Sequence, residues 1–264
     1  MKLSVTRTAL LLALPLTLAI VSCKKKSKGD DGVGAPSAVE IRFAHKVTAF
    51  SNLVLDSSYP VAVPAPALVS TFTIKDFKYY ISNIYLVSAT SGDTVKIPDT
   101  YFLVEHKKPN SLKLPFTAPA GEYYEMSFLI GIDDAKNSTG PHTGALDPSL
   151  GMFWNKNDGY IMGVLEGTSP ASVAADKSYS FHIGGTKAPY NVTARRHFKL
   201  GGNISIDPTK KTVINIDTDA KAWLTTPNGA LFVTTPVINA PGDASFKVSQ
   251  NYFKMFDFVS VKFE

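Results

Sequence analysis

Short apolar runs with a two-residue period recur along most of this chain and constrain what it can fold into. Apolar side chains occupy every second position at Met126, Phe128, Ile130 and Ile132, and Tyr179, Phe181 and Ile183 recur in the same way. Because successive side chains of a strand point to opposite faces, such runs are typical of half-buried β-strands. No long segment carries the 3.6-residue period of an amphipathic helix. Further runs rich in branched and aromatic residues are 39–47, 72–87, 101–104, 160–165, 213–216 and 258–261.

Turn-forming stretches separate these runs, as at Ser91-Gly92-Asp93 and Pro241-Gly242-Asp243. The pattern predicts an all-β protein, built as a single antiparallel β-sandwich or barrel-like domain with long irregular loops. The best candidate for a helix is short and C-terminal, at residues 249–256, with Ser249 as its cap.

The chain begins with the pattern of an exported lipoprotein. Lys2 and Arg7 precede an apolar stretch, residues 9–21, that is too short to span a bilayer. Cys23 follows it and is the only cysteine of the chain. The pattern resembles a bacterial lipoprotein signal, in which the cysteine is lipidated and becomes the mature N-terminus. A buried N-terminal helix is the alternative, and the three lysines directly after Cys23 disfavour it.

These features predict three segments and a location. Residues 1–22 are the expected signal peptide, residues 23–38 a flexible tether with almost no bulky apolar side chain, and residues 39–264 the folded domain. We expect an exported protein of the cell envelope, anchored through lipid such as palmitate on Cys23, with the bacterial outer membrane favoured. The lysines of the tether could bind anionic headgroups or form a solvated spacer.

Composition and missing motifs exclude several classes of function. The formal net charge of +5 comes mostly from the ends of the chain, so the folded part is nearly neutral and no nucleic-acid partner is expected. A single cysteine at the lipidation site excludes a cysteine nucleophile and a cysteine-only metal site. The chain has no phosphate-binding loop, no G-x-S-x-G elbow and no H-E-x-x-H motif, so we expect no enzyme.

Two of the five histidines stand out. Alternation places His45 on the same face as Ile41 and Phe43, which should point inward. A buried imidazole needs a partner for each ring nitrogen, and either a metal or a hydrogen-bond network could supply it. His182 is followed by the pair Gly184-Gly185, which would allow a close backbone approach or simply form a turn.

Two further segments carry candidate ligands. Trp154 lies among loop-forming residues, and Met152 adds a thioether that suits a cuprous ion, although covering the edge of a core and filling a core are the commoner roles of such residues. The other segment is rich in side-chain oxygens, which suit a hard cation such as calcium or could bond to their own backbone. Its candidate ligands are Asp133, Asp134, Asn137 and Asp147.

Several motifs, taken in chain order, resemble the MbnP-like family of secreted copper-binding proteins, which is named for members associated with methanobactin. The motifs are FAHKV (43–47), KYYISNI (78–84), GALDP (144–148), GMFW (151–154) and FHIGG (181–185). The resemblance implies copper binding rather than turnover. It also implies that His45 and His182 are ligands, and that Trp154 occupies the position of a tryptophan that is oxidised to kynurenine in some relatives.

We therefore expect a lipid-anchored protein that holds copper or serves its uptake. His45 and His182 would bind one cuprous ion, with Met152 or Trp154 as a weak third contact. The expected partners are the membrane, through the lipid on Cys23, and a copper-delivery or redox protein; the oligomeric state stays open. The alternative is a metal-free surface lipoprotein that binds glycan or a protein partner through exposed aromatics. Its candidate contacts are Tyr79, Tyr80, Tyr85, Tyr123, Tyr124 and Trp154.

Overall fold

The computed structural model describes residues 34–48 and 51–264. The expected signal peptide, Cys23 and most of the expected tether lie outside the described residues. Strand β1 (Pro36–Thr48) begins three residues before the expected domain, and its first residues pair with strand β7. In the described part of the chain, no helix has the length and apolar character needed to cross a bilayer.

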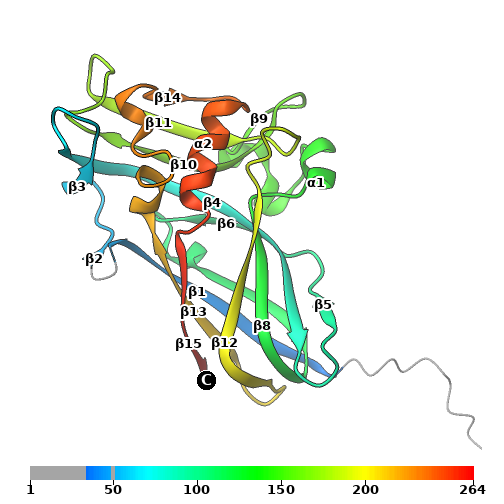
Figure 1. The fold of residues 1–264 in the computed structure, drawn as a ribbon. Coiled ribbons are helices and arrows are strands. Elements are labelled where there is room, and N and C mark those ends of the chain that lie inside the picture. Colours follow the sequence, from blue (N-terminus) through cyan, green and yellow to red (C-terminus); the bar gives the residue numbers. More distant parts are fainter. Residues whose placement is uncertain (1–33, 49–50) are drawn as a thin grey trace, which may run out of the picture. The chain divides into compact units, whose positions relative to one another are not determined.

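The smaller of two sheets is built around β1. Its strand order is β15-β13-β1-β2 (Figure 1). Strand β7 also pairs with β1. The bounds of these further strands are β15 (Phe256–Phe263), β13 (Thr212–Asp219), β2 (Ser51–Asn52) and β7 (Lys113–Pro119).

The larger sheet is built around β4 (Val69–Ser88), a strand of 20 residues. Its order is β12-β8-β4-β10-β11-β14, and four short strands pair with β4 or β10 outside this order. The main partners are β12 (Ala194–Ile206), β8 (Gly121–Ile130), β10 (Gly159–Thr168), β11 (Ser178–Gly184) and β14 (Val237–Ile238). The short strands are β3 (Tyr59–Ala62), β5 (Thr94–Lys96) and β6 (Tyr101–Glu105) on β4, and β9 (Phe153–Asn155) on β10.

The all-β prediction is confirmed, since strands dominate the described chain and most neighbours are antiparallel. Two pairs differ from the expected pattern. Strands β1 and β13 are parallel, with Phe43 opposite Ile216, and β11 and β14 are parallel as well. Parallel neighbours need long connections, and most of the domain lies between β1 and β13 along the chain.

The helices are short and lie between strands. α2 (Asp243–Tyr252) begins six residues before the expected helix, and its N-cap is Gly242. Ser249 therefore lies inside α2, where its hydroxyl donates to the carbonyl of Phe246 (2.7 Å). The other helical segments are α1 (Asp134–Ser138), η1 (Pro109–Leu112), η2 (Gly144–Leu146), η3 (Pro148–Leu150), η4 (Ala220–Leu224) and η5 (Leu231–Val233).

Aromatic side chains join the two sheets. Phe43 of β1 packs on Tyr79 of β4 and Phe128 of β8, with ring centroids 6.0 Å apart in both pairs, and on Phe256 of β15 at 5.6 Å. Edge-to-face pairs of this kind add to the stabilisation from burial alone. The inner face of β1, which carries the site described below, is thereby fixed over β4 and β8.

A long excursion between β8 and β10 covers the other face of the larger sheet. The hydroxyl of Tyr80 on β4 donates to the carbonyl of Ala145 (2.9 Å), and the ring of Tyr80 meets that of Tyr160 edge-on at 6.1 Å. Strand β4 thus has buried aromatic side chains on both faces.

Gly167 marks a close approach of β10 to β4. A Cβ atom added here would collide with the backbone carbonyl of Thr73 and lie 2.8 Å from the hydroxyl of Tyr179. Gly167→Ala should therefore lower the free energy of unfolding by about 2 kcal/mol or more, as measured by urea denaturation. Gly121→Ala is the matched control, because its nearest neighbour would be Tyr123 at 3.6 Å, and it should change stability by less than about 0.5 kcal/mol. Equal losses in the two variants would contradict the close approach.

Candidate functional site

The structure brings His45 against a second histidine, His106. The two Nδ1 atoms lie 3.1 Å apart, and the rings stack with centroids 5.3 Å apart. His45 comes from β1, and His106 directly follows β6. The backbone N–H of His106 donates to the carbonyl of Phe77 on β4 (2.9 Å). The hydrogen bond to β4 therefore holds His106 next to His45 on the inner face of β1.

A second set of contacts orients the ring of His45. Its Nε2 atom lies 3.0 Å from the hydroxyl oxygen of Tyr79, which in turn lies 3.2 Å from the hydroxyl of Thr218. Both ring nitrogens of His45 thus have protein partners, and the hydrogen-bond network expected as one alternative is present. Burial raises the pKa of the Tyr79 hydroxyl, so this group stays protonated and can donate.

The surroundings keep the two imidazoles neutral. His45 is only 5% exposed, and the ring of Phe77 meets it at 4.9 Å. Burial, with a smaller contribution from the charge of His106, lowers the pKa of His45 to about 3. Burial also lowers the pKa of His106, which is partly exposed. At neutral pH the pair therefore presents two uncharged nitrogen bases that face each other.

Two facing neutral imidazoles restrict the metals that the pair could hold. No group of three or more His, Cys, Asp or Glu side chains suited to a metal ion occurs in residues 34–48 and 51–264. Structural zinc takes four ligands, and calcium takes six or more oxygens. A cuprous ion accepts imidazole nitrogen and tolerates two ligands, so it matches this donor set best.

His182 lies elsewhere. His182 on β11 is opposite Val164 on β10, and Val164 is in turn opposite Lys78 on β4. His182 therefore shares a face of the sheet with Lys78, and Phe77 is the residue next to Lys78 along β4. Because neighbouring positions alternate between faces, His182 and the Phe77–His45 contact lie on opposite faces of the larger sheet. Nε2 of His182 instead meets a carboxylate oxygen of Glu166 at 2.6 Å. The structure does not bring His45 and His182 together as the expected copper site requires.

The two weak ligands expected from the sequence also lie outside the pair. The ring of Trp154 covers Gly184, leaving no room there for a Cβ atom. Met152 is fully buried, and its carbonyl accepts from the N–H of Ile161 (3.0 Å).

The tryptophan on the His45 side is Trp223. Its buried ring lies 6.1 Å from that of Phe77, and its Nε1–H donates to the sulfur of Met255 at 3.2 Å.

Each candidate ligand of the oxygen-rich segment bonds to a different protein group. Asp133 caps α1 by accepting from the N–H of Lys136, and Asp134 accepts from the hydroxyl of Thr186 at 2.5 Å. In the same way Asn137 accepts from the N–H of Tyr160, and Asp147 from that of Ser149. Asp133 and Asp147 thus bond to nearby backbone, as the alternative expected, whereas Asp134 and Asn137 bond to distant parts of the chain.

Three tyrosines of the glycan-binding alternative lie in the core. Tyr79, Tyr80 and Tyr123 are buried, with exposures of 3% or less. Their rings therefore stabilise the sheets and cannot form an exposed binding surface.

The low pKa of His45 predicts a pH-dependent stability in the metal-free protein. The unfolded ring titrates near 6.5 and the folded ring near 3, so only the unfolded state binds this proton between those values. Stability from this residue is therefore complete above pH 6.5 and falls as the pH drops, by at most about 1.4 kcal/mol per pH unit. Urea denaturation at several pH values should show a smaller acid loss for His45→Gln than for the unaltered chain. Identical slopes would contradict a buried neutral ring.

The chain is similar to known proteins. The family model MbnP matches residues 36–240. The structure of MbnP from Methylosinus trichosporium is similar, with 16% sequence identity, a TM-score of 0.48, and coverage of 80% of this chain and 82% of the other. A comparison with curated proteins found no match.

Proposed function

From the premise that this chain belongs to the MbnP family, and is thus methanobactin-related, we propose that it holds one cuprous ion between His45 and His106. The observation that carries the proposal is the 3.1 Å approach of the two Nδ1 atoms. At this distance one ring can donate its Nδ1 proton to the other, and a shift of that proton to Nε2 of the same neutral ring leaves both Nδ1 atoms free as ligands for a cation. Only a small separation of the rings is needed to admit the ion.

The contacts behind His45 favour this exchange. When Nδ1 binds a metal, Nε2 carries the proton and can donate it to Tyr79, whose hydroxyl can then donate to Thr218. A metal-ligating histidine commonly has such a partner on its other nitrogen, which fixes the tautomer and the ring orientation. The apolar ring of Phe77 beside His45 disfavours a doubly charged ion more than a singly charged one.

The proposal retains the expected setting of the protein. An exported chain anchored through a lipid on Cys23 would keep this site at the cell envelope, where a copper-delivery or redox protein could reach it. The sequence pattern around Cys23 supports the anchor. We propose binding rather than catalysis, because the pair offers two neutral bases and no complementary acid.

Removal of either imidazole should abolish tight copper binding. Under anaerobic conditions the unaltered protein should take up one cuprous ion per chain in competition with bicinchoninate. His106→Ala and His45→Ala should weaken that uptake by more than about 100-fold, because each removes one of two ligands. His182→Ala is the matched control and should retain full uptake. Loss of binding in His182→Ala, or its retention in both other variants, would overturn the assignment.

Tyr79→Phe tests the contact behind His45. The variant keeps the ring and its packing but removes the hydrogen-bond partner of Nε2, so affinity for the cuprous ion should fall by about 10-fold while the stoichiometry stays at one. Competition titration measures both quantities. An unchanged affinity would show that the Tyr79 hydroxyl does not orient the ligand.

A further inference from the structure

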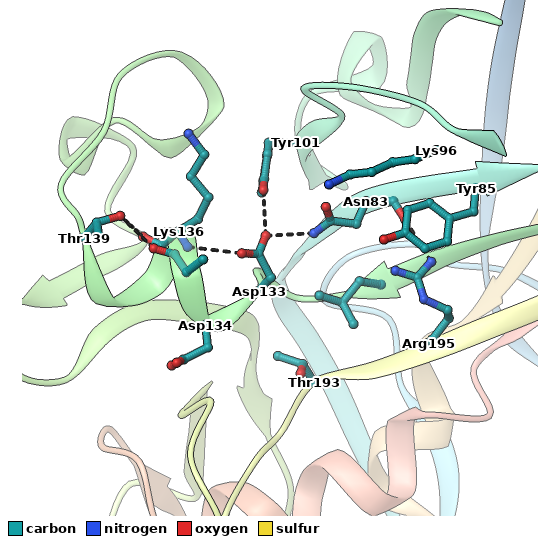
Figure 2. A pocket seen from close by; sticks show the side chains of 12 residues that line it. Asn83, Tyr85, Lys96, Tyr101, Asp133, Asp134, Lys136, Thr139, Thr193 and Arg195 are labelled. Carbon is teal, nitrogen blue, oxygen red and sulfur yellow. Dashed lines mark hydrogen bonds between the residues drawn. The ribbon is translucent and has the colours of Figure 1, made fainter. Parts of the chain in front are cut away.

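A hollow of about 650 Å³ lies beside α1, away from the histidine pair, and three cationic side chains line it. Figure 2 shows these side chains, which come from three different elements. Lys96 belongs to β5, Lys136 to α1 and Arg195 to β12. A volume of this size is typical of sites for small molecules.

Arg195 is held rigidly in the wall. Its Nη1 donates to the carbonyl of Asn83 (2.9 Å) and to the hydroxyl of Ser127 (3.2 Å), and its guanidinium lies 4.0 Å from the centre of the Tyr85 ring. Within the described part of the chain, its Nε and Nη2 have no hydrogen-bond acceptor. A fixed guanidinium with donors to spare is a ready partner for a carboxylate.

The two carboxylates of the wall are already occupied. Asp133 accepts from the hydroxyl of Tyr101 (2.6 Å), the side-chain amide of Asn83 (2.8 Å) and the N–H of Lys136 (3.1 Å). Asp134 is bonded to Thr186, and Figure 2 shows its carboxylate directed away from Arg195. Neither forms an ion pair with the three cations, and no other carboxylate among residues 34–48 and 51–264 does so.

We propose that this hollow binds a small organic polycarboxylate. Three cations of the wall form no ion pair in the described part of the chain, while the two carboxylates of the wall are bonded to other groups, and the ligand would supply negative charge to the unpaired cations. The charges are spread over the hollow rather than gathered at one point, which suits a molecule with several separated carboxylates. A compact phosphate would leave much of the volume empty and could not reach all three cations at once. The proposal is independent of copper binding, because no residue of the histidine pair lines the hollow.

Citrate is the probe for the test, with inorganic phosphate as the second arm. Calorimetric titration of the full chain in metal-free buffer at low salt should give one site for citrate with a dissociation constant below about 1 mM. Phosphate should bind at least about 10-fold more weakly. Lys96→Gln and Lys136→Gln should each weaken citrate binding by about threefold, and Arg195→Gln by about 10-fold or more. Lys156→Gln removes an exposed lysine outside the hollow and should leave binding unchanged.

The lysine variants keep the test decisive if Arg195→Gln fails to fold, because neither ammonium group donates a hydrogen bond to the protein in the described residues. No saturable binding of citrate would overturn the proposal. Equal binding of phosphate would overturn the preference for polycarboxylates, and an equal loss in Lys156→Gln would show a nonspecific charge effect. Loss of citrate binding in the hollow variants with copper uptake intact would confirm two separate sites.

Discussion

Strand β4 is hydrogen-bonded along both edges for most of its 20 residues. The positions of its partner strands, and of the histidine pair, depend on this pairing. One edge pairs with β10 and then with β8, while β3, β6 and β5 pair with the other. Such pairing leaves little of the strand open to other chains. Because Tyr79 and Tyr80 point to opposite faces, β4 contributes to the packing on both sides of the sheet. The histidine pair also depends on it, through the backbone of Phe77 beneath His106 and the hydroxyl of Tyr79 beside His45.

The burial of His45 disfavours the protonation that an exposed imidazole undergoes at mildly acidic pH. A buried ring between Phe77 and Tyr79 is more stable when uncharged, and the same condition leaves its nitrogen lone pair free for a metal. Stability at neutral pH and readiness to bind thus favour the same protonation state. The cationic hollow near α1 differs in kind, since its three charges remain without counter-ions at the surface.

The alternation of apolar residues along the sequence predicted most strands and the inward face of His45. Alternation placed His45 on an inward face, and most strands formed where branched and aromatic residues gathered. Strand β12 was missed because Gly201 and Gly202 interrupt its alternation, and the register on β8 shifts at the same place. His106 could not be selected, because only the pairing of β6 with β4 carries it to β1. The expected partnership with His182 is not formed, because a sequence motif does not reveal which face of a neighbouring sheet its histidine occupies.

The two rings of the pair differ in their access to solvent: His45, on the inner face of β1, is buried, whereas His106, directly after β6, is partly exposed. This asymmetry implies an order in which the two nitrogens would lose a bound ion. If the pair holds a cuprous ion as proposed above, a ligand that extracts this ion would first displace the outer nitrogen, and the inner nitrogen would be released last. Transfer between proteins would then proceed through a shared intermediate in which His45 still holds the ion, so that the cargo never passes through water.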